Sequence, residues 1–146
     1  MMMMKRFCVV LLCAGALACE GITGPNFPEV AGTYSGPLTV TSSLAGTASG
    51  TMVLTVVQAT EQLTITGSVT FFGSTSQIPA ITGTINETGF FTATAGGATA
   101  AAPDPDCGVM TTTSATINFS GGTVRFHQSI TTTYCGSLAF DATLTR

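Results

Sequence analysis

The ten residues Q-L-T-I-T-G-S-V-T-F, positions 62–71, decide the fold of this chain. The apolar residues Leu63, Ile65, Val69 and Phe71 stand at odd positions, and hydroxyl or amide side chains fill all the even ones. Successive side chains of a β-strand point to opposite faces, so the pattern predicts a strand with one apolar face and one hydroxyl face. After residue 30 no stretch sustains the 3.6-residue apolar period of an amphipathic helix, and we expect an all-β protein.

The same alternation, interrupted by short turn-forming segments, covers the rest of the chain. It predicts about eight strands, at residues 32–42, 50–59, 62–72, 77–86, 89–95, 109–119, 123–134 and 137–145. Connections of a few residues join antiparallel neighbours, because a parallel crossover needs a dozen or more residues. A meander of this kind leaves two unpaired edges, and pairing of the last strand with the first removes both. We therefore expect an antiparallel meander closed into a small β-barrel.

Strand parity also predicts which side chains fill the interior. Phe71-Phe72 and Phe90-Phe91 each place one ring on either side of the sheet, which makes Phe72 and Phe91 a candidate surface patch. The predicted core consists of Tyr34, Leu38, Val40, Met52, Leu54, Val56, Leu63, Ile65, Val69, Phe71, Ile81, Ile85, Phe90, Ile117, Phe119, Val124, Phe126, Ile130, Leu138, Phe140 and Leu144.

One hairpin can be set in register from the sequence. Gly121-Gly122 predicts a two-residue turn that places Phe119 opposite Val124, so that the numbers of paired residues sum to 243. This register keeps the apolar residues of both strands on one face. The residue numbers of Cys107 and Cys135 sum to 242, one less than the sum for paired residues, and both cysteines lie at the open end of the same hairpin. One bulged residue would therefore bring them opposite each other. We expect a disulfide there, which the chain-entropy treatment values at about 3.5 kcal/mol.

The first 18 residues have the layout of a signal peptide. Lys5 and Arg6 precede twelve apolar or small residues, positions 7–18. That run is too short to span a bilayer as a helix, which needs about 20 residues.

The stretch G-A-L-A-C, residues 15–19, resembles the lipobox of bacterial lipoproteins, in which the cysteine is acylated and becomes the first residue of the mature chain. That family usually has leucine three places before the cysteine, where this chain has Ala16. A-L-A at 16–18 also fits ordinary signal peptidase, so a secreted, unlipidated β domain is the alternative. The resemblance implies that Cys19 carries lipid and that the protein is exported and anchored to a bacterial membrane. Lipoproteins of that family that stay in the inner membrane often have aspartate after the cysteine, so with Glu20 at that position the resemblance implies the outer membrane.

The cysteine count agrees with lipidation. Of the five cysteines, Cys8 and Cys13 leave with the leader, and acylation of Cys19 leaves Cys107 and Cys135 to pair. The expected organisation is a signal peptide at 1–18, a lipidated cysteine with a flexible tether at 19–30, and a single barrel domain at 31–146.

Charge excludes one class of function. Charged residues are 8% of the chain, against about 25% in typical proteins, and 28 threonines supply polarity instead. Loss of Lys5 and Arg6 moves the net charge from −3 to −5 (−3 − 2), and only Arg125 and Arg146 remain as strong bases. No basic patch exists for nucleic acid to bind.

The sequence offers little for catalysis or metal binding. His127 is the only histidine, and strand parity turns it outward, so we expect an ordinary exposed residue and not a catalytic base. Asp104 and Asp106 supply two carboxylates, whereas calcium takes about six to eight oxygen ligands. We therefore expect no metal, no cofactor and no enzymatic activity.

In architecture the predicted barrel resembles lipocalin- and avidin-like barrels, with Gly32-Thr33-Tyr34 where those families often have Gly-x-Trp. We expect a non-enzymatic envelope lipoprotein whose barrel binds a small apolar ligand or a protein partner. One alternative is a structural or assembly subunit of an envelope complex, without a ligand. Another is a membrane-spanning barrel with its apolar faces outward and its threonines inside.

Overall fold

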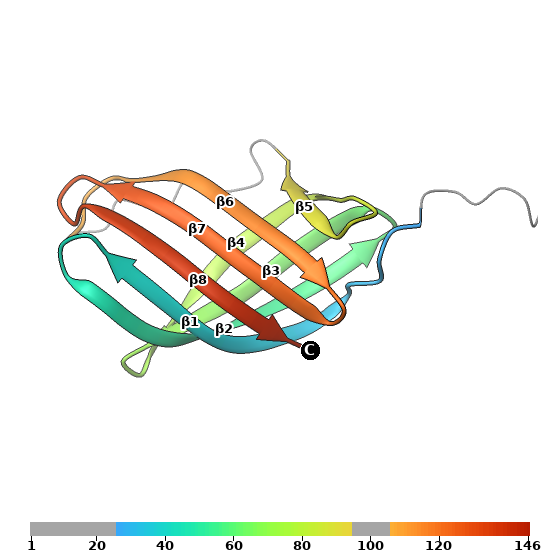
Figure 1. Cartoon of the computed structure of the whole chain (residues 1–146), viewed down its shortest axis with the longest axis horizontal. Coiled ribbons are helices and arrows are strands. Elements are labelled where there is room, and N and C mark those ends of the chain that lie inside the picture. Colours follow the sequence, from blue (N-terminus) through green and yellow to red (C-terminus); the bar gives the residue numbers. More distant parts are fainter. Residues whose placement is uncertain (1–25, 95–105) are drawn as a thin grey trace, which may run out of the picture.

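A computed structural model describes residues 26–94 and 106–146, and both segments belong to one closed barrel (Figure 1). Its strands follow one another in chain order, each antiparallel to the next, and β8 pairs with β1. The all-β class, the meander and the closure are confirmed. Cys19 and Asp104 lie outside the described residues. Within the described ranges, no helix has the length and apolar character needed to cross a membrane. The strands are β1 (Gly32–Ser42), β2 (Gly46–Ala59), β3 (Gln62–Phe71), β4 (Ser74–Ile85), β5 (Phe90–Ala93), β6 (Met110–Ser120), β7 (Thr123–Thr132) and β8 (Ser137–Thr145).

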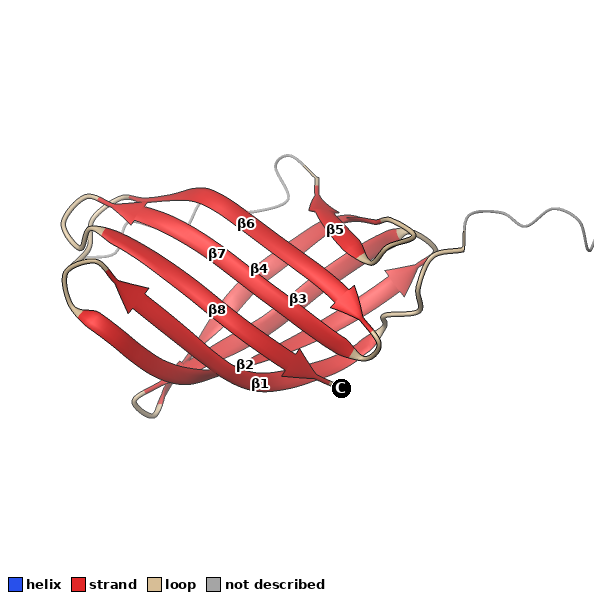
Figure 2. Ribbon diagram, in the orientation of Figure 1, coloured by secondary structure: helices blue, strands red, loops and turns tan. Residues whose placement is uncertain are grey.

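The barrel has two ends that differ in what they carry. The chain enters β1 at the end that also holds the C-terminus, and we call this the tether end (Figure 1). The turns at 60–61, 86–89 and 121–122 lie there too, since alternate connections of a meander share an end. The turns at 43–45, 72–73 and 133–136 lie at the opposite end, which we call the far end (Figure 2).

The hairpin of β6 and β7 has the predicted register. Phe119 lies opposite Val124, and Gly121-Gly122 forms the turn with φ angles of 55° and 82°. The register shifts by one residue between Thr112 and Ser114, which leaves Thr112 opposite Ile130. A bulge thus changes the sum of paired numbers from 243 to 242, the value that the two cysteines require.

The disulfide between Cys107 and Cys135 is confirmed, with a Cα–Cα distance of 5.0 Å. Backbone hydrogen bonds support the same junction: the amide of Tyr134 donates to Cys107 O at 3.1 Å, and that of Thr133 donates to Val109 O at 3.2 Å. The segment before β6 is therefore fixed to the β7–β8 turn at the far end.

The apolar face of each strand points inward. Leu63 and Ile65 are buried, and Val69 and Phe71 are partly buried against the core, so the inverted barrel with threonines inside is wrong. The most deeply buried part of the core consists of nine side chains, each no more than 2% exposed: Tyr34, Leu38, Met52, Leu54, Leu63, Ile65, Ile85, Leu144 and Val124. Toward the far end the inward side chains are only partly buried, among them Val40, Val69, Phe71, Ile78 and Phe140.

The prediction for Phe90 and Phe91 was wrong. Phe91 is 5% exposed and lies opposite Ile85 inside the barrel, whereas Phe90 is 39% exposed on the outer face. A surface patch of Phe72 with Phe91 therefore does not exist.

The turn between β4 and β5 explains this error. A two-residue turn at 87–88 would have set Ile85 opposite Phe90, but the turn includes one residue more, because Gly89 adopts a φ of 84°. Asn86 stabilises the longer turn, since its Oδ1 accepts the amides of Thr88 at 3.0 Å and Phe90 at 2.9 Å. One added residue exchanges the two faces of the following strand.

The last residues of the predicted tether pack against the barrel. Val30 is 4% exposed and Phe27 packs against the core. Gln58 holds this segment from both sides: its Oε1 accepts the Val30 amide at 2.7 Å, and its Nε2 donates to Pro28 O at 3.0 Å. Sequence analysis missed this packing because a segment with two prolines and no apolar period gives no strand pattern.

Candidate functional site

The eight strands carry very few charges, and these lie together. Arg125 on β7 and Asp141 on β8 are the only Arg, Lys, Asp or Glu residues within the described strands, and the single histidine, His127, lies between them. All three point outward, because they alternate with inward residues such as Val124, which is fully buried. Charged groups in an otherwise uncharged wall mark this face as a candidate site.

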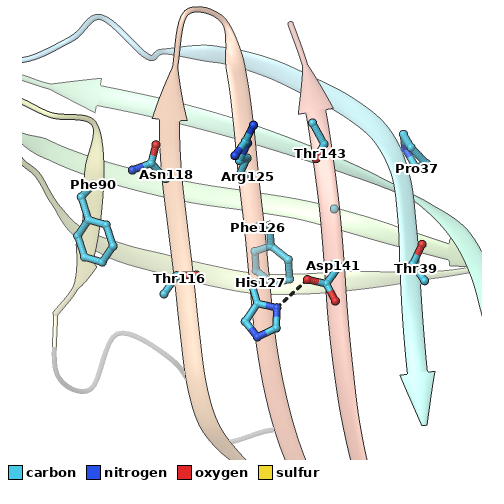
Figure 3. A pocket seen from close by; sticks show the side chains of 11 residues that line it. Pro37, Thr39, Phe90, Thr116, Asn118, Arg125, Phe126, His127, Asp141 and Thr143 are labelled. Carbon is cyan, nitrogen blue, oxygen red and sulfur yellow. Dashed lines mark hydrogen bonds and ion pairs between the residues drawn. The ribbon is translucent and has the colours of Figure 1, made fainter. Parts of the chain in front are cut away.

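The three residues line an open groove of about 840 Å³ on the outside of the barrel (Figure 3). The groove crosses β5, β6, β7, β8 and β1. Phe90 forms one wall, and Pro37 stands on the opposite side, where β1 and β8 pair at Ser35 and again only from Leu38. Its lining consists of Pro37, Thr39, Phe90, Thr116, Asn118, Arg125, Phe126, His127, Asp141, Ala142 and Thr143.

His127 has a carboxylate on one side and a hydroxyl on the other. Asp141 is its direct cross-strand neighbour, and the Asp141 Oδ1 to His127 Nδ1 distance is 2.7 Å (Figure 3). Ser129, two residues along β7 on the same face, has its Oγ 3.3 Å from His127 Nε2. The side chains of His127 and Asp141 are 43% and 59% exposed. The three side chains therefore form a chain of two hydrogen bonds. His127 and Asp141 line the groove, and Ser129 lies two positions along β7 beyond its lining.

The direction of these bonds follows from the chemistry of the partners. An ionised carboxylate only accepts hydrogen bonds, so Asp141 fixes the proton of a neutral imidazole on Nδ1. Nε2 is then unprotonated, and Ser129 Oγ donates to it. This arrangement can bind a polar ligand, and it can also remove a proton from the Ser129 hydroxyl.

Sequence analysis placed His127 on the outer face and interpreted it as an ordinary exposed residue. It identified neither Asp141 nor Ser129 as a partner of that side chain. Histidine and serine at i and i+2 of a strand share a face, so H-x-S was a usable signal. Asp141 could not be found in this way, because its position opposite His127 depends on the length of the β7–β8 turn.

A second surface lies at the far end. Four large apolar side chains are exposed there, at or beside the turns: Leu44 (72%), Phe72 (91%), Val109 (60%) and Tyr134 (71%). We call these four the far-end tips. Phe72 is exposed as predicted. Asp106 is the only charged residue at this end of the described chain.

Phe72 also has an unfavourable backbone conformation. Its φ is 49°, and Gly73 after it has a φ of 80°, so both central residues of the β3–β4 turn are left-handed. Such turns favour asparagine, aspartate or glycine. A bulky residue in this conformation costs about 1–3 kcal/mol, and outliers of this kind often mark functional positions.

No metal cluster is seen in the part of the chain that the structure describes: nowhere in 26–94 or 106–146 do three His, Cys, Asp or Glu side chains gather closely enough to hold an ion. Comparison with protein-family models and with curated proteins finds no match to this chain.

Proposed function

We propose that this protein is an exported lipoprotein, anchored through Cys19 to the outer membrane of a bacterium, and that it binds a protein partner of the envelope through the far-end tips. The observation that carries the proposal is Phe72, a 91% exposed aromatic side chain on a left-handed backbone. An isolated domain gains nothing from that residue in that place. A binding site accounts for both the exposure of the aromatic ring and the strain of its backbone.

The position of the tether supports this orientation. Phe27 and Val30 pack at the tether end, so an anchor at Cys19 holds that end near the lipid. Cys19 and Phe27 are eight positions apart in the sequence (27 − 19), and a chain of that length spans about 30 Å at most. The far-end tips would then face away from the anchoring membrane, where a partner can reach them.

Charge distribution indicates the chemistry of the partner. Glu29, Glu61, Glu87 and Arg146 belong to the tether end, while the far end presents apolar side chains among threonines and serines. Aromatic residues are enriched at the energetic centres of protein interfaces, and charged residues are depleted there. We expect the partner to offer an uncharged, apolar surface.

Replacement of Phe72 separates binding from folding. Phe72→Asn should stabilise the free domain by about 1 kcal/mol, because asparagine tolerates the left-handed conformation, and the same change should weaken partner binding. Urea denaturation measures the first effect. Unchanged or lower stability would show that the turn is not strained, and normal binding by the variant would remove Phe72 from the interface.

The interface itself can be tested by photo-crosslinking in the intact envelope. A photoreactive side chain at Phe72 or Tyr134 should give one discrete adduct. The same group at Val57, which is 63% exposed on the wall of β2, should not. Equal adducts from all three positions, or none at Phe72 and Tyr134, would overturn the proposed interface.

The anchor is tested by the intact mass of the mature protein taken from membranes. We expect cleavage before Cys19, added acyl mass, and the loss of two hydrogens from the Cys107–Cys135 pair. A mass that starts at residue 19 without acyl groups would support the secreted, unlipidated form instead.

A small apolar ligand is the second candidate, favoured by the partly buried side chains in the far-end half of the barrel, such as Val69, Phe71 and Phe140. A fluorescent apolar probe, N-phenylnaphthylamine, should bind saturably. Val69→Phe should abolish this binding by filling the interior, whereas Val57→Phe on the outer wall should not. Absence of binding to the unmodified protein would eliminate this candidate.

A further inference from the structure

We propose that Ser129 is an activated nucleophile, with His127 as its general base and Asp141 as the positioning residue, and that the outer groove accepts an ester. The groove and the far-end tips are separate surfaces, so this inference stands or falls independently of the proposed partner.

The geometry matches the order of roles in a nucleophile–base–carboxylate relay. Asp141 Oδ1 lies 2.7 Å from His127 Nδ1, and Ser129 Oγ lies 3.3 Å from His127 Nε2. Such a relay is recognised by geometry and roles, not by the order of residues in the chain. The second distance is slightly long, as nucleophile–base contacts often are without substrate.

An ordinary explanation covers only half of the arrangement. On that explanation, His127 and Asp141 form an exposed cross-strand pair that stabilises β7 against β8 slightly. That explanation does not require a hydroxyl on the other ring nitrogen. It also gives no reason for the groove of about 840 Å³ beside the pair.

The reaction follows from these three side chains and water. Ser129 Oγ attacks the carbonyl carbon of an ester, and its proton moves to His127 Nε2. The ester C–O bond then breaks, and His127 returns the proton to the departing alkoxide. Water, deprotonated by His127, then attacks the carbonyl carbon of the acyl-serine. The bond from that carbon to Ser129 Oγ breaks, His127 returns the proton to Ser129 Oγ, and the acid is released. Asp141 remains ionised and stabilises the imidazolium form of His127 in each half of the cycle.

The lining of the groove indicates the class of ester. Arg125 is its only Arg or Lys side chain, and Asp141 already accepts from His127. Asn118 and Thr116 add hydrogen-bonding groups, and Phe90 adds one apolar wall. We infer a preference for polar esters that carry a negative charge, since Arg125 can pair with it.

Ser129 is tested with a fluorophosphonate probe on the full chain, matured in a bacterial envelope and purified in detergent. Peptide mapping should place the label on Ser129 and not on Ser68, a half-buried, outward-facing serine of β3. His127→Ala should slow labelling by about 10²–10⁴-fold, the usual contribution of a general base. No label on Ser129, or equal labelling in His127→Ala, would overturn the inference.

The positioning role of Asp141 needs a readout that a structural role would not change. Asp141→Asn should slow labelling at least about tenfold, while Asp141→Glu should recover part of the rate and the melting temperatures of both variants should agree. If Asp141→Asn labels at the normal rate, Asp141 only bridges the two strands. The ester preference is tested by hydrolysis of 4-nitrophenyl acetate against its mono-succinate analogue, and equal rates would reject the role of Arg125.

Discussion

Tyr34 shows how much of the tether end depends on one side chain. It is 1% exposed, and its hydroxyl donates to Val30 O at 2.8 Å. The ring of Phe119 meets it edge-on at 5.9 Å, and Arg146 Cζ lies 5.5 Å from its centroid. Tyr34 therefore joins the incoming segment, the last turn-proximal residues of β6 and the C-terminal residue. Burial raises the pKa of the Tyr34 hydroxyl above its usual value of 10.0, and Arg146 opposes this effect.

Tyr34→Phe removes the hydroxyl and leaves the Val30 carbonyl without its donor. We expect a loss of about 1–2 kcal/mol of unfolding free energy at pH 7. Because the folded-state pKa is raised, the unfolded chain ionises first, so the wild-type protein should lose additional stability as the pH rises above 10. Urea denaturation at pH 7 and above pH 10 measures both effects.

Tyr134→Phe is the matched control, since Tyr134 is 71% exposed. This variant should change neither the unfolding free energy at pH 7 nor its loss above pH 10. If Tyr34→Phe keeps the same alkaline loss of stability as the wild type, another group is responsible for it.

At the scale of the strands, alternation predicted most of the fold, because period 2 is a local property. The errors of the prediction arose in the turns, whose lengths the alternation does not determine. The β3–β4 turn contains only residues 72–73, whereas turn residues such as Ser74 and Ser76 indicated a longer one. The added residue at Gly89 reversed β5 and exchanged Phe90 with Phe91. A strand of four residues has too few positions for its own pattern to correct such an error.

Gly67 belongs to the inward pattern of β3, between Ile65 and Val69, and its missing side chain leaves room for a neighbour. A Cβ there would clash with the Val53 carbonyl oxygen and would lie 2.8 Å from Leu54 Cδ2. Gly67→Ala should therefore lower stability by about 1–3 kcal/mol through overpacking. Thermal unfolding measures this effect.

The neighbouring change Ser68→Ala is the control, because Ser68 points outward and should tolerate it within about 0.5 kcal/mol. A stable Gly67→Ala variant would mean that β2 and β3 can separate without cost to the packing of the barrel.

At the scale of the molecule, the candidate site was less predictable than the fold. The disulfide could be predicted because both cysteines belong to one hairpin with a recognisable turn. The contact between His127 and Asp141 instead depends on the register of β7 and β8, which the turn at 133–136 sets. That turn contains Cys135 and is held by the disulfide, so the cross-link stabilises the barrel and restrains the turn that aligns the candidate site.

Removal of the disulfide tests its contribution to the whole barrel. Cys107 and Cys135 are 28 residues apart in sequence, so Cys107→Ser/Cys135→Ser should cost about 3.5 kcal/mol of unfolding free energy, because the unfolded chain regains the freedom of a closed loop. Reduction of the wild-type protein should give a similar loss, and the reductant should not affect the double variant. Because Thr132 Oγ1 accepts the Cys135 amide at 2.9 Å and donates to Gly136 O at 2.8 Å, we expect β7 and β8 to keep their register in the variant. A loss below about 1 kcal/mol would show that these hydrogen bonds, and not the cross-link, hold the far end together.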